Sequence, residues 1–328
     1  MQIKKAGYNG ILLPELKIGF DYSGSDADHI FISHAHADHM PRGSQLSVYA
    51  TEHTIEFMKK RGFSGKAAAM PFGEPLDTGR ARATFYPAGH ILGSAMTYIE
   101  SEWGTVLYTG DYRTPPSPAT EGFELPEPVD FFITEATFSL PIYKWPSTGE
   151  LIEQVRSFAQ RTLDEGGTPL FLAYNLGKAQ EIMHIVAPLD HIVQIHGAGY
   201  KLCSVYEEAD IDLGQYEPYD RESCEGKILI APTSAFNNGF ASNVKKLRIA
   251  YCSGWAARES TRTQLTVDKL IPLSDHLDFF ELIRLCKKLQ PKKVFITHTP
   301  NAKVVRHYLD NLDIESVFLD LEAETNDE

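Results

Sequence analysis

The stretch Ile30-Phe31-Ile32-Ser33-His34-Ala35-His36-Ala37-Asp38-His39 joins a short apolar run to three histidines and one aspartate. Three imidazoles and a carboxylate so close together cannot all be buried in an apolar core without partners. A loop at the end of a strand can turn such side chains toward one point, where imidazole nitrogens and a carboxylate suit Zn²⁺ or a similar divalent ion. The pattern H-x-H-x-D-H after an apolar run therefore predicts a metal site in preference to a solvated polar loop.

The composition around this motif is that of an ordinary globular chain. Its 328 residues are 43% hydrophobic, and 31 lysines and arginines stand against 44 aspartates and glutamates, which gives a net charge of −13. This acidic balance argues against a broad cationic surface for nucleic acid or anionic membranes. The chain has no apolar run of the ~18 residues that a membrane span needs, no apolar leader segment and no C-x-x-C pair. We expect a soluble, cytoplasmic protein with reduced thiols and no membrane partner.

The pattern of apolar residues changes twice along the chain. Up to residue 145, short strands separated by Gly and Pro predominate, with one helix over 52–61. A capping-box pattern at Ser147 then opens a helix that ends at Gly166. The strand-helix alternation that follows is typical of a small α/β unit with a parallel sheet.

We place this unit at 146–254, as an insertion between residues 1–145 and 255–328 of a first domain. The final segment again alternates between strands and helices, which we predict over residues 269–273, 278–289, 293–297, 301–312 and 316–319.

The H-x-H-x-D-H run resembles the hallmark of the metallo-β-lactamase fold family, and this resemblance implies further metal ligands downstream. They are His90 in the turn Ala88–Ser94, Asp111 after the run Thr105–Thr109, and His298 at the end of Phe295-Ile-Thr-His298. Each alone would more often be a structural polar residue.

In the company of the first motif, these three residues are the ligands that the resemblance to the metallo-β-lactamase fold family implies. The resemblance implies two divalent ions, with Zn²⁺ expected and Mn²⁺ as an alternative for activity. Two such ions lower the pKa of a bound water and stabilise both the attacking and the leaving oxygen of a displacement. The ligand set that the resemblance implies is His34, His36 and His90 for one ion, Asp38, His39 and His298 for the other, and Asp111 as a bridge.

Other segments resemble the β-CASP nucleases, the group that contains RNase J, the polyadenylation endonuclease and Artemis. They are Ala88-Gly-His-Ile-Leu-Gly-Ser-Ala-Met96, Leu176-Gly-Lys-Ala-Gln-Glu181 and Leu273-Ser-Asp-His-Leu-Asp-Phe279. The resemblance implies an α/β fold, a metallo-β-lactamase αββα sandwich that carries an inserted compact β-CASP cap domain.

The same resemblance implies catalytic roles for Asp38, His276 and Glu135. Asp38 would hold metal and help to activate water. His276 is the candidate general acid, because phosphodiester cleavage leaves an alkoxide of high pKa that a protonated imidazole can neutralise. Glu135 would raise the pKa of His276 and fix its tautomer. Without the motifs, His276 would be a polar residue beside a helix and Glu135 a surface acid.

Four residues are candidates for substrate binding. Lys178 begins a predicted helix, where backbone N–H groups and an ammonium can receive a phosphate. Trp255 could stack a base, and Arg258 could pair with a phosphate, while Ser274 belongs to the motif of His276. The alternatives are a solvated lysine for Lys178 and a plug between domains for Trp255.

Three segments are similar to those of the bacterial ligase-associated DNA exonucleases, namely Ala231-Pro-Thr-Ser-Ala235, Tyr251-Cys-Ser-Gly-Trp-Ala-Ala-Arg258 and Ser274-Asp-His276. The resemblance implies a DNA exonuclease of repair that acts on single-stranded or end-containing DNA, with an ATP-dependent DNA ligase and a helicase as partners. An RNA-processing nuclease of the RNase J type is the alternative, because histidine at position 298 is associated with RNA enzymes of the group. A thioester hydrolase like glyoxalase II and a catalytically dead binding subunit are more distant alternatives.

Overall fold

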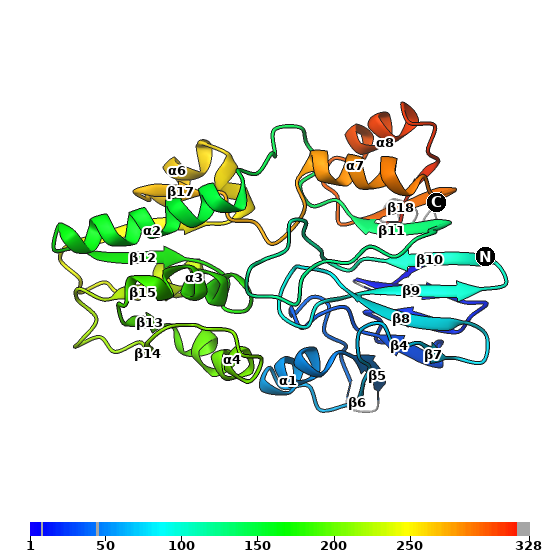
Figure 1. Cartoon of the computed structure of the whole chain (residues 1–328), viewed down its shortest axis with the longest axis horizontal. Helices are drawn as coiled ribbons and strands as arrows, with labels where there is room; N and C mark the ends of the chain where they lie inside the picture. The colour runs from blue at the N-terminus through cyan, green and yellow to red at the C-terminus, as the bar shows by residue number, and fades with distance from the viewer. Residues whose placement is uncertain (8, 44–45, 320–328) are drawn as a thin grey trace, which may run out of the picture. The chain divides into compact units, whose positions relative to one another are not determined.

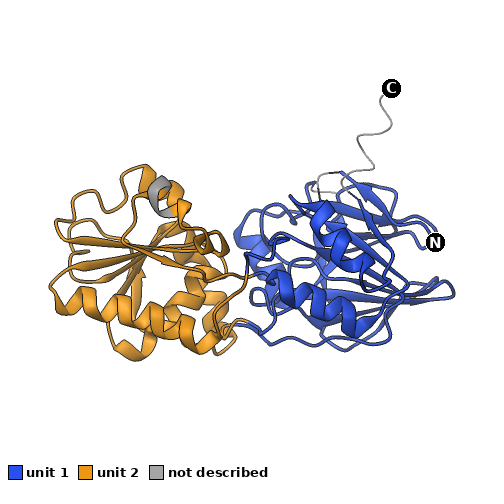
Figure 2. Ribbon diagram, turned by 90° about the horizontal axis from the view of Figure 1, so that it is seen from above, with its two compact units in different colours: residues 1–116, 120–143, 276–328 blue, residues 117–119, 144–275 orange. Residues whose placement is uncertain are grey.

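The computed structural model describes residues 1–7, 9–43 and 46–319, with the backbone alone for residues 262–264 (Figure 1). None of the helices in these ranges has the length and apolar character needed to cross a membrane. The chain divides into two compact units, which Figure 2 colours separately. Unit 1 comprises residues 1–116, 120–143 and 276–328, and unit 2 comprises residues 117–119 and 144–275.

Unit 1 contains two sheets that pack face to face. A six-stranded sheet has the order β1-β2-β3-β4-β5-β6, antiparallel through β3 and parallel from there on. A seven-stranded sheet has the order β19-β18-β11-β10-β9-β8-β7. The strands of the first sheet are β1 Lys4–Ala6, β2 Gly10–Leu13, β3 Ile18–Phe20, β4 His29–Phe31, β5 Ser47–Ala50 and β6 Lys66–Ala69. Those of the second are β7 Leu76–Asp77, β8 Arg82–Pro87, β9 Ala95–Ser101, β10 Gly104–Tyr108, β11 Phe131–Glu135, β18 Lys293–Thr297 and β19 Ser316–Phe318.

Two apolar clusters hold these layers together. The first lies between the sheets, where Phe20 and Phe31 meet Phe85 and Ile133. The second lies on the other face of the seven-stranded sheet and is covered by the helices α7 Phe279–Leu289 and α8 Ala302–Asp310 (Figure 1). The helix α1 Glu52–Lys60 contacts β6 of the first sheet. Unit 1 is therefore an αββα sandwich, as the sequence predicted.

Unit 2 is built on one parallel sheet with the order β14-β13-β15-β12-β16-β17. The predicted capping box is present, because the Ser147 side chain accepts from the Glu150 N–H and the Glu150 side chain accepts from that of Ser147. The strands are β12 Thr168–Leu172, β13 Val193–Ile195, β14 Tyr216–Pro218, β15 Ile228–Ala231, β16 Leu247–Cys252 and β17 Lys269–Ile271. The helices are α2 Thr148–Asp164, α3 Lys178–Val186, α4 Gly197–Glu208, α5 Thr233–Asn237 and α6 Ser260–Leu265, with short 3₁₀ turns η1 Ala187–Leu189 and η2 Gly254–Ala257.

The compact units differ from the predicted domain boundaries chiefly at the return to unit 1; in addition, unit 2 begins two residues earlier, at Lys144, and includes residues 117–119. The sequence placed the return to the first domain at residue 255, whereas the structure keeps residues up to Asp275 in unit 2. The reason is β17, which pairs in parallel with β16 and extends the sheet of unit 2, although its sequence suggested a strand of the first domain.

All four cysteines are free and buried.

Candidate metal centre

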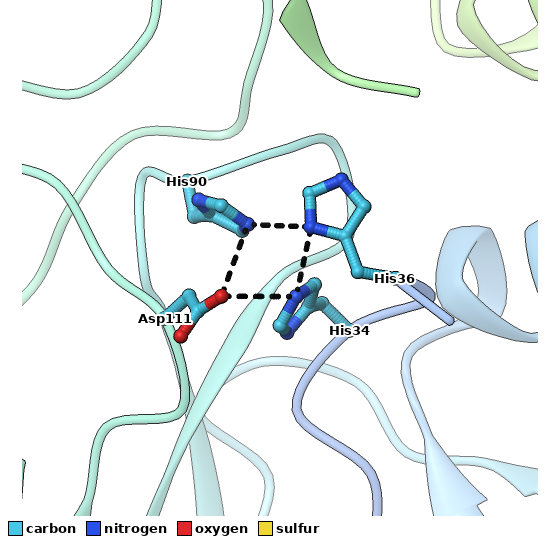
Figure 3. Close-up of side chains that lie close together, drawn as sticks. All are labelled: His34, His36, His90 and Asp111. Carbon is cyan, nitrogen blue, oxygen red and sulfur yellow. Dashed lines mark hydrogen bonds and ion pairs between the residues drawn. The ribbon is translucent and has the colours of Figure 1, made fainter. Parts of the chain in front are cut away.

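Four side chains from three strand ends of unit 1 converge on one point (Figure 3). His34 and His36 follow β4, His90 follows β8 and Asp111 follows β10. The Nδ1 atom of His36 lies 3.1 Å from the Nε2 atom of His34 and 3.1 Å from that of His90. The Oδ2 atom of Asp111 lies 3.5 Å from His34 Nε2 and 3.8 Å from His90 Nε2.

This spacing fits a tetrahedral metal ion. Ligand atoms about 2.0–2.1 Å from a zinc ion at the corners of a tetrahedron are about 3.3 Å from each other. Burial, together with the nearby His39 and His90, holds the pKa of His34 well below its ordinary value. Since metals bind the neutral imidazole, the cluster of His34, His36, His90 and Asp111 could bind a divalent metal.

His39 lies next to this cluster and forms a second polar group with Asp21 and Asp38. Its Nε2 atom is 3.5 Å from Asp111 Oδ2 and 3.9 Å from Asp38 Oδ2, and its Nδ1 atom is 2.7 Å from Asp21 Oδ2. Burial lowers the pKa of His39, but the carboxylates of Asp111 and Asp21 outweigh it and raise the value to about 10. Desolvation raises the pKa of the half-exposed Asp38, but His39 and His36 bring it below its ordinary value.

His298 is placed differently from the other predicted ligands. Its ring centre is 5.7 Å from that of His39, and its backbone adopts a left-handed conformation with φ 51°. Its Nδ1 atom lies 2.9 Å from Thr297 Oγ1 and its Nε2 atom 2.9 Å from Asn9 Oδ1. Among the described residues, Asp38, His39 and His298 do not join a set of ligand atoms as close as that of the first cluster.

His276 and Glu135 form a pair beside the first cluster. The Nδ1 atom of His276 is 2.7 Å from Glu135 Oε1, and the His276 ring centre is 5.2 Å from that of His90. Burial opposes ionisation of Glu135, yet His276 and Thr137 lower its pKa overall. An ionised Glu135 accepts a hydrogen bond from His276 Nδ1–H, which fixes the orientation of the ring.

No family model matches the chain. It is 30% identical over 293 residues, 88% of this chain and 28% of the relative, to a protein of Opitutus terrae named probable DNA ligase. It is 30% identical over 184 residues, 48% of the chain and 43% of the relative, to the RNase J-like protein of Methanocaldococcus jannaschii. It is 24% identical over 313 residues, 87% of the chain and 54% of the relative, to 5' exonuclease Apollo of Rattus norvegicus.

These relatives are metallo-β-lactamase/β-CASP proteins. The chain belongs to the metallo-β-lactamase/β-CASP family. It spans between about a quarter and about a half of the lengths of these three relatives. A solved structure of a protein of unknown function from Enterococcus faecalis V583 shares the fold, with a TM-score of 0.61 and 13% identity over 90% of this chain and 80% of the other.

Two residues of this β-CASP protein that sequence reasoning missed support the second polar group. The Oδ1 atom of Asp21 accepts from the Ser33 N–H at 2.7 Å, while its Oδ2 atom accepts from the hydroxyls of Ser33 and Tyr108 at 2.6 and 2.7 Å. Asp21 directly follows the apolar run Ile18–Phe20, much as Asp111 follows the run Thr105–Thr109, and this placement is the one signal in the sequence that could have pointed to it. Asn9, the partner of His298, has no comparable signal in the sequence.

The predicted substrate-binding residues of unit 2 lie in two kinds of surroundings. Lys178 is 2% exposed, and its ammonium is 2.6 Å from the Asp275 carboxylate. It is therefore not the solvated lysine considered as an alternative, and it would have to leave this ion pair to receive a phosphate. Ser274 is also buried, whereas Trp255 in η2 is 37% exposed and Arg258 is exposed at the end of η2.

Proposed function

We propose that the protein is a metal-dependent nuclease that hydrolyses phosphodiester bonds. The observation that carries the proposal is the first cluster, in which each of the four ligand atoms lies 3.1–3.8 Å from its neighbours. The His276–Glu135 pair lies beside it. His34, His36, His90 and Asp111 would hold one ion, and Asp38, His39 and His298, with Asp111 between, would hold a second. Zn²⁺ is the expected ion, with Mn²⁺ as an alternative for activity.

Divalent ions at these positions would polarise the phosphate and lower the pKa of a water that attacks it. The residues of the chain supply the rest of the reaction. His276, oriented through Nδ1 by Glu135, would give a proton to the leaving oxygen, which as an alkoxide would otherwise be a poor leaving group. Asp38, which lies in the second polar group with His39, would orient the attacking water. A thiolate has a much lower pKa than an alkoxide, so a thioester hydrolase would have little use for His276.

DNA is the proposed substrate, attacked from an end of a single strand in the course of repair. Support comes from the relatives named 5' exonuclease Apollo and probable DNA ligase. The second relative also suggests a DNA ligase as partner. A helicase as partner is proposed from the family resemblance alone. The acidic net charge of −13 favours a narrow slot for a strand end over a broad cationic surface. RNA is the second candidate, because the chain also resembles an RNase J-like protein and carries His298.

The test uses matched oligonucleotides labelled at the 5′ or the 3′ end, one set with deoxyribose and one with ribose. Purified protein with Zn²⁺ or Mn²⁺ should shorten the deoxyribose strand stepwise from one end, and the two labels reveal the polarity. His276→Ala serves as the inactive control. Degradation of the ribose strand alone would reassign the substrate to RNA, and no cleavage of either strand would contradict the proposal.

A further inference from the structure

The turn of residues 88–94, which carries His90, is held in place at Gly93. Gly93 is buried, and its carbonyl accepts from the hydroxyls of Thr51 and Thr54 at 2.6 and 2.9 Å. Both hydroxyls belong to the start of α1, where Thr51 is the N-cap and also accepts from the Thr54 N–H. The turn is therefore joined to α1 through one peptide carbonyl.

The close approach of this turn to α1 requires a glycine. Gly93 has a φ of 78°, in the left-handed region that favours glycine. A Cβ atom at this position would lie 2.8 Å from the Thr54 backbone nitrogen and 2.9 Å from Thr51 Oγ1. Any larger residue would push the turn away from the start of α1.

Glu121 holds the other polar group of the same residue. The Gly93 N–H group donates to both carboxylate oxygens of Glu121, at 2.9 and 3.0 Å. Hydrogen bonds to a carboxylate are stronger than those between neutral groups. The Oε1 atom of Glu121 also lies 3.0 Å from Nδ1 of His53, which belongs to α1. The carboxylate therefore joins the turn to α1 a second time.

The segment that carries Glu121 runs along the start of the turn. Phe123 pairs with Ala88 in an isolated antiparallel bridge. The Glu124 N–H group donates to the Pro87 carbonyl at 3.1 Å. The carboxylate of Glu121 is thus presented by a backbone that is itself held against the turn.

The position of the turn decides where the Nε2 atom of His90 lies. This atom is 3.1 Å from Nδ1 of His36, which reaches the first cluster from a different loop, after β4 (Figure 3). The groups of a metal site have to stay within about 0.5 Å of the productive geometry. A turn that could shift on α1 would carry His90 away from the ligands that follow β4.

We infer that Glu121 is a positioning residue of the metal centre, whose carboxylate holds Gly93 and thereby keeps His90 in place for the ion of the first cluster. The inference rests on the proposed function, since Glu121 has this task only if the cluster binds metal. Glu121 is not one of the four converging ligands, so it acts through the Gly93 peptide. A purely structural role would instead change stability and leave the affinity for metal unchanged.

The experiment titrates chelator-stripped full-length protein with Co²⁺, whose visible absorption reports the geometry of its ligands, and with Zn²⁺ in competition with a chelating dye. Glu121→Ala should bind the ion of the first cluster about 10- to 100-fold more weakly than the wild type, as for other groups that orient a metal ligand. Its Co²⁺ spectrum should also differ. Glu121→Gln should recover most of the affinity and the wild-type spectrum, because its amide oxygen can still accept from the Gly93 N–H.

Glu217→Ala is the matched control for the loss of a carboxylate. Glu217 also holds two side chains, those of Gln194 and Lys227, but it does so in unit 2. This variant should be less stable in urea denaturation and should bind Co²⁺ like the wild type. A Glu121→Ala variant that behaves in the same way, or a Glu121→Gln variant that binds no better than Glu121→Ala, would overturn the inference.

Hydrogen exchange of the Gly93 amide in wild-type protein provides a second measurement if Glu121→Ala does not fold. The inference predicts that this amide is protected in metal-free protein, because Glu121 holds the turn before the ion binds. An amide that exchanges freely until metal is added would contradict it. Failure of the proposed function is recognised separately, because wild-type protein would then bind no Co²⁺ at all, and the inference would fall with it.

Discussion

The strand ends of the two units differ in the chemistry of the side chains that follow them. In unit 1, histidines or acids stand at or just after the ends of β4, β8, β10, β11 and β18. In unit 2, β12, β15 and β16 are followed by Tyr174, Ser234 and Ser253, which line a cavity of about 250 Å³. Loops at the carboxyl ends of strands are the usual places for ligands in α/β sheets. Unit 2 also has such groups, His196 after β13 and Asp220 after β14, but among the described residues neither belongs to a set of converging ligand atoms like that of the first cluster.

The difference indicates a division of tasks. Imidazoles and carboxylates can bind metal and titrate, whereas hydroxyl groups can only donate and accept hydrogen bonds. Substitutions in unit 1 should therefore change metal content and turnover, and substitutions in unit 2 should change stability without changing metal content.

The largest effect is expected for His90→Ala, which removes one of the four converging ligands of the first cluster. The variant should lose the tightly bound ion, and its cleavage of DNA should fall to that of chelator-stripped protein. Elemental analysis and the end-label assay measure both. His184→Ala is the control, because His184 lies in α3 of unit 2, where its Nδ1 atom is 2.8 Å from the backbone carbonyl of Asp212. A His90→Ala variant that keeps a full complement of metal would remove His90 from the ligand set.

His276→Ala should separate proton transfer from metal binding. Loss of a general acid lowers turnover by about 100- to 10,000-fold, while the metal content should stay that of the wild type. Glu135→Gln should have a smaller effect, about 10- to 100-fold, because it disturbs only the orientation of the ring. If His276→Ala loses metal as readily as Asp38→Ala, the separate roles of the two residues are wrong.

Asp21→Asn should weaken metal binding at the position that contains His39. Removing the carboxylate that holds His39 Nδ1 should cost about 10- to 100-fold in affinity for one ion, as for other groups that support a metal ligand. Zinc titration resolves the two binding steps. An equal loss in both steps would mean that Asp21 supports the loop as a whole and not His39 in particular.

Lys178→Met should affect the stability of unit 2 and leave the metal content unchanged. Removing the lysine breaks the buried ion pair with the Asp275 carboxylate, which costs about 3–5 kcal/mol in the free energy of unfolding. The double variant Lys178→Met/Asp275→Leu should recover most of that loss in urea denaturation. Weaker DNA binding with unchanged stability would instead favour the phosphate-binding role predicted from the sequence.

The smallest effect is expected for Ser253→Ala, beside the cavity of unit 2. The Ser253 hydroxyl accepts from the Trp255 N–H at the start of η2. Its loss should lower the free energy of unfolding by about 1 kcal/mol, the ordinary cost of losing such a cap, with metal content and turnover unchanged. A large loss of turnover would show that the strand ends of unit 2 take part in the reaction.

Sequence patterns predicted most of this architecture because the signals are local. The apolar run before His34 forms β4, and the capping box at Ser147 starts α2. Helix periodicity located the ends of α7 and α8 to within one or two residues. The fold class followed from motifs, and the relatives support it. The strand β17 was placed in the wrong unit, because a strand of three residues does not reveal which sheet it joins.

The parts of the site that could not be predicted depend on contacts between distant segments. Asn9 meets His298 across 289 residues, and Lys178 meets Asp275 across 97. In neither pair does the spacing or the flanking sequence of one residue indicate its contact with the other. The orientation of His298 is also set by a left-handed backbone conformation, which is uncommon for residues other than glycine and is not encoded in a short motif.

The most direct test of the central claim is removal and return of metal in the end-label assay. Protein stripped with a chelator should not cleave DNA, and stepwise addition of Zn²⁺ or Mn²⁺ should restore cleavage in the wild type but not in His90→Ala. Cleavage by stripped protein that elemental analysis shows to be free of metal would contradict the account, as would a His90→Ala variant that recovers in parallel with the wild type.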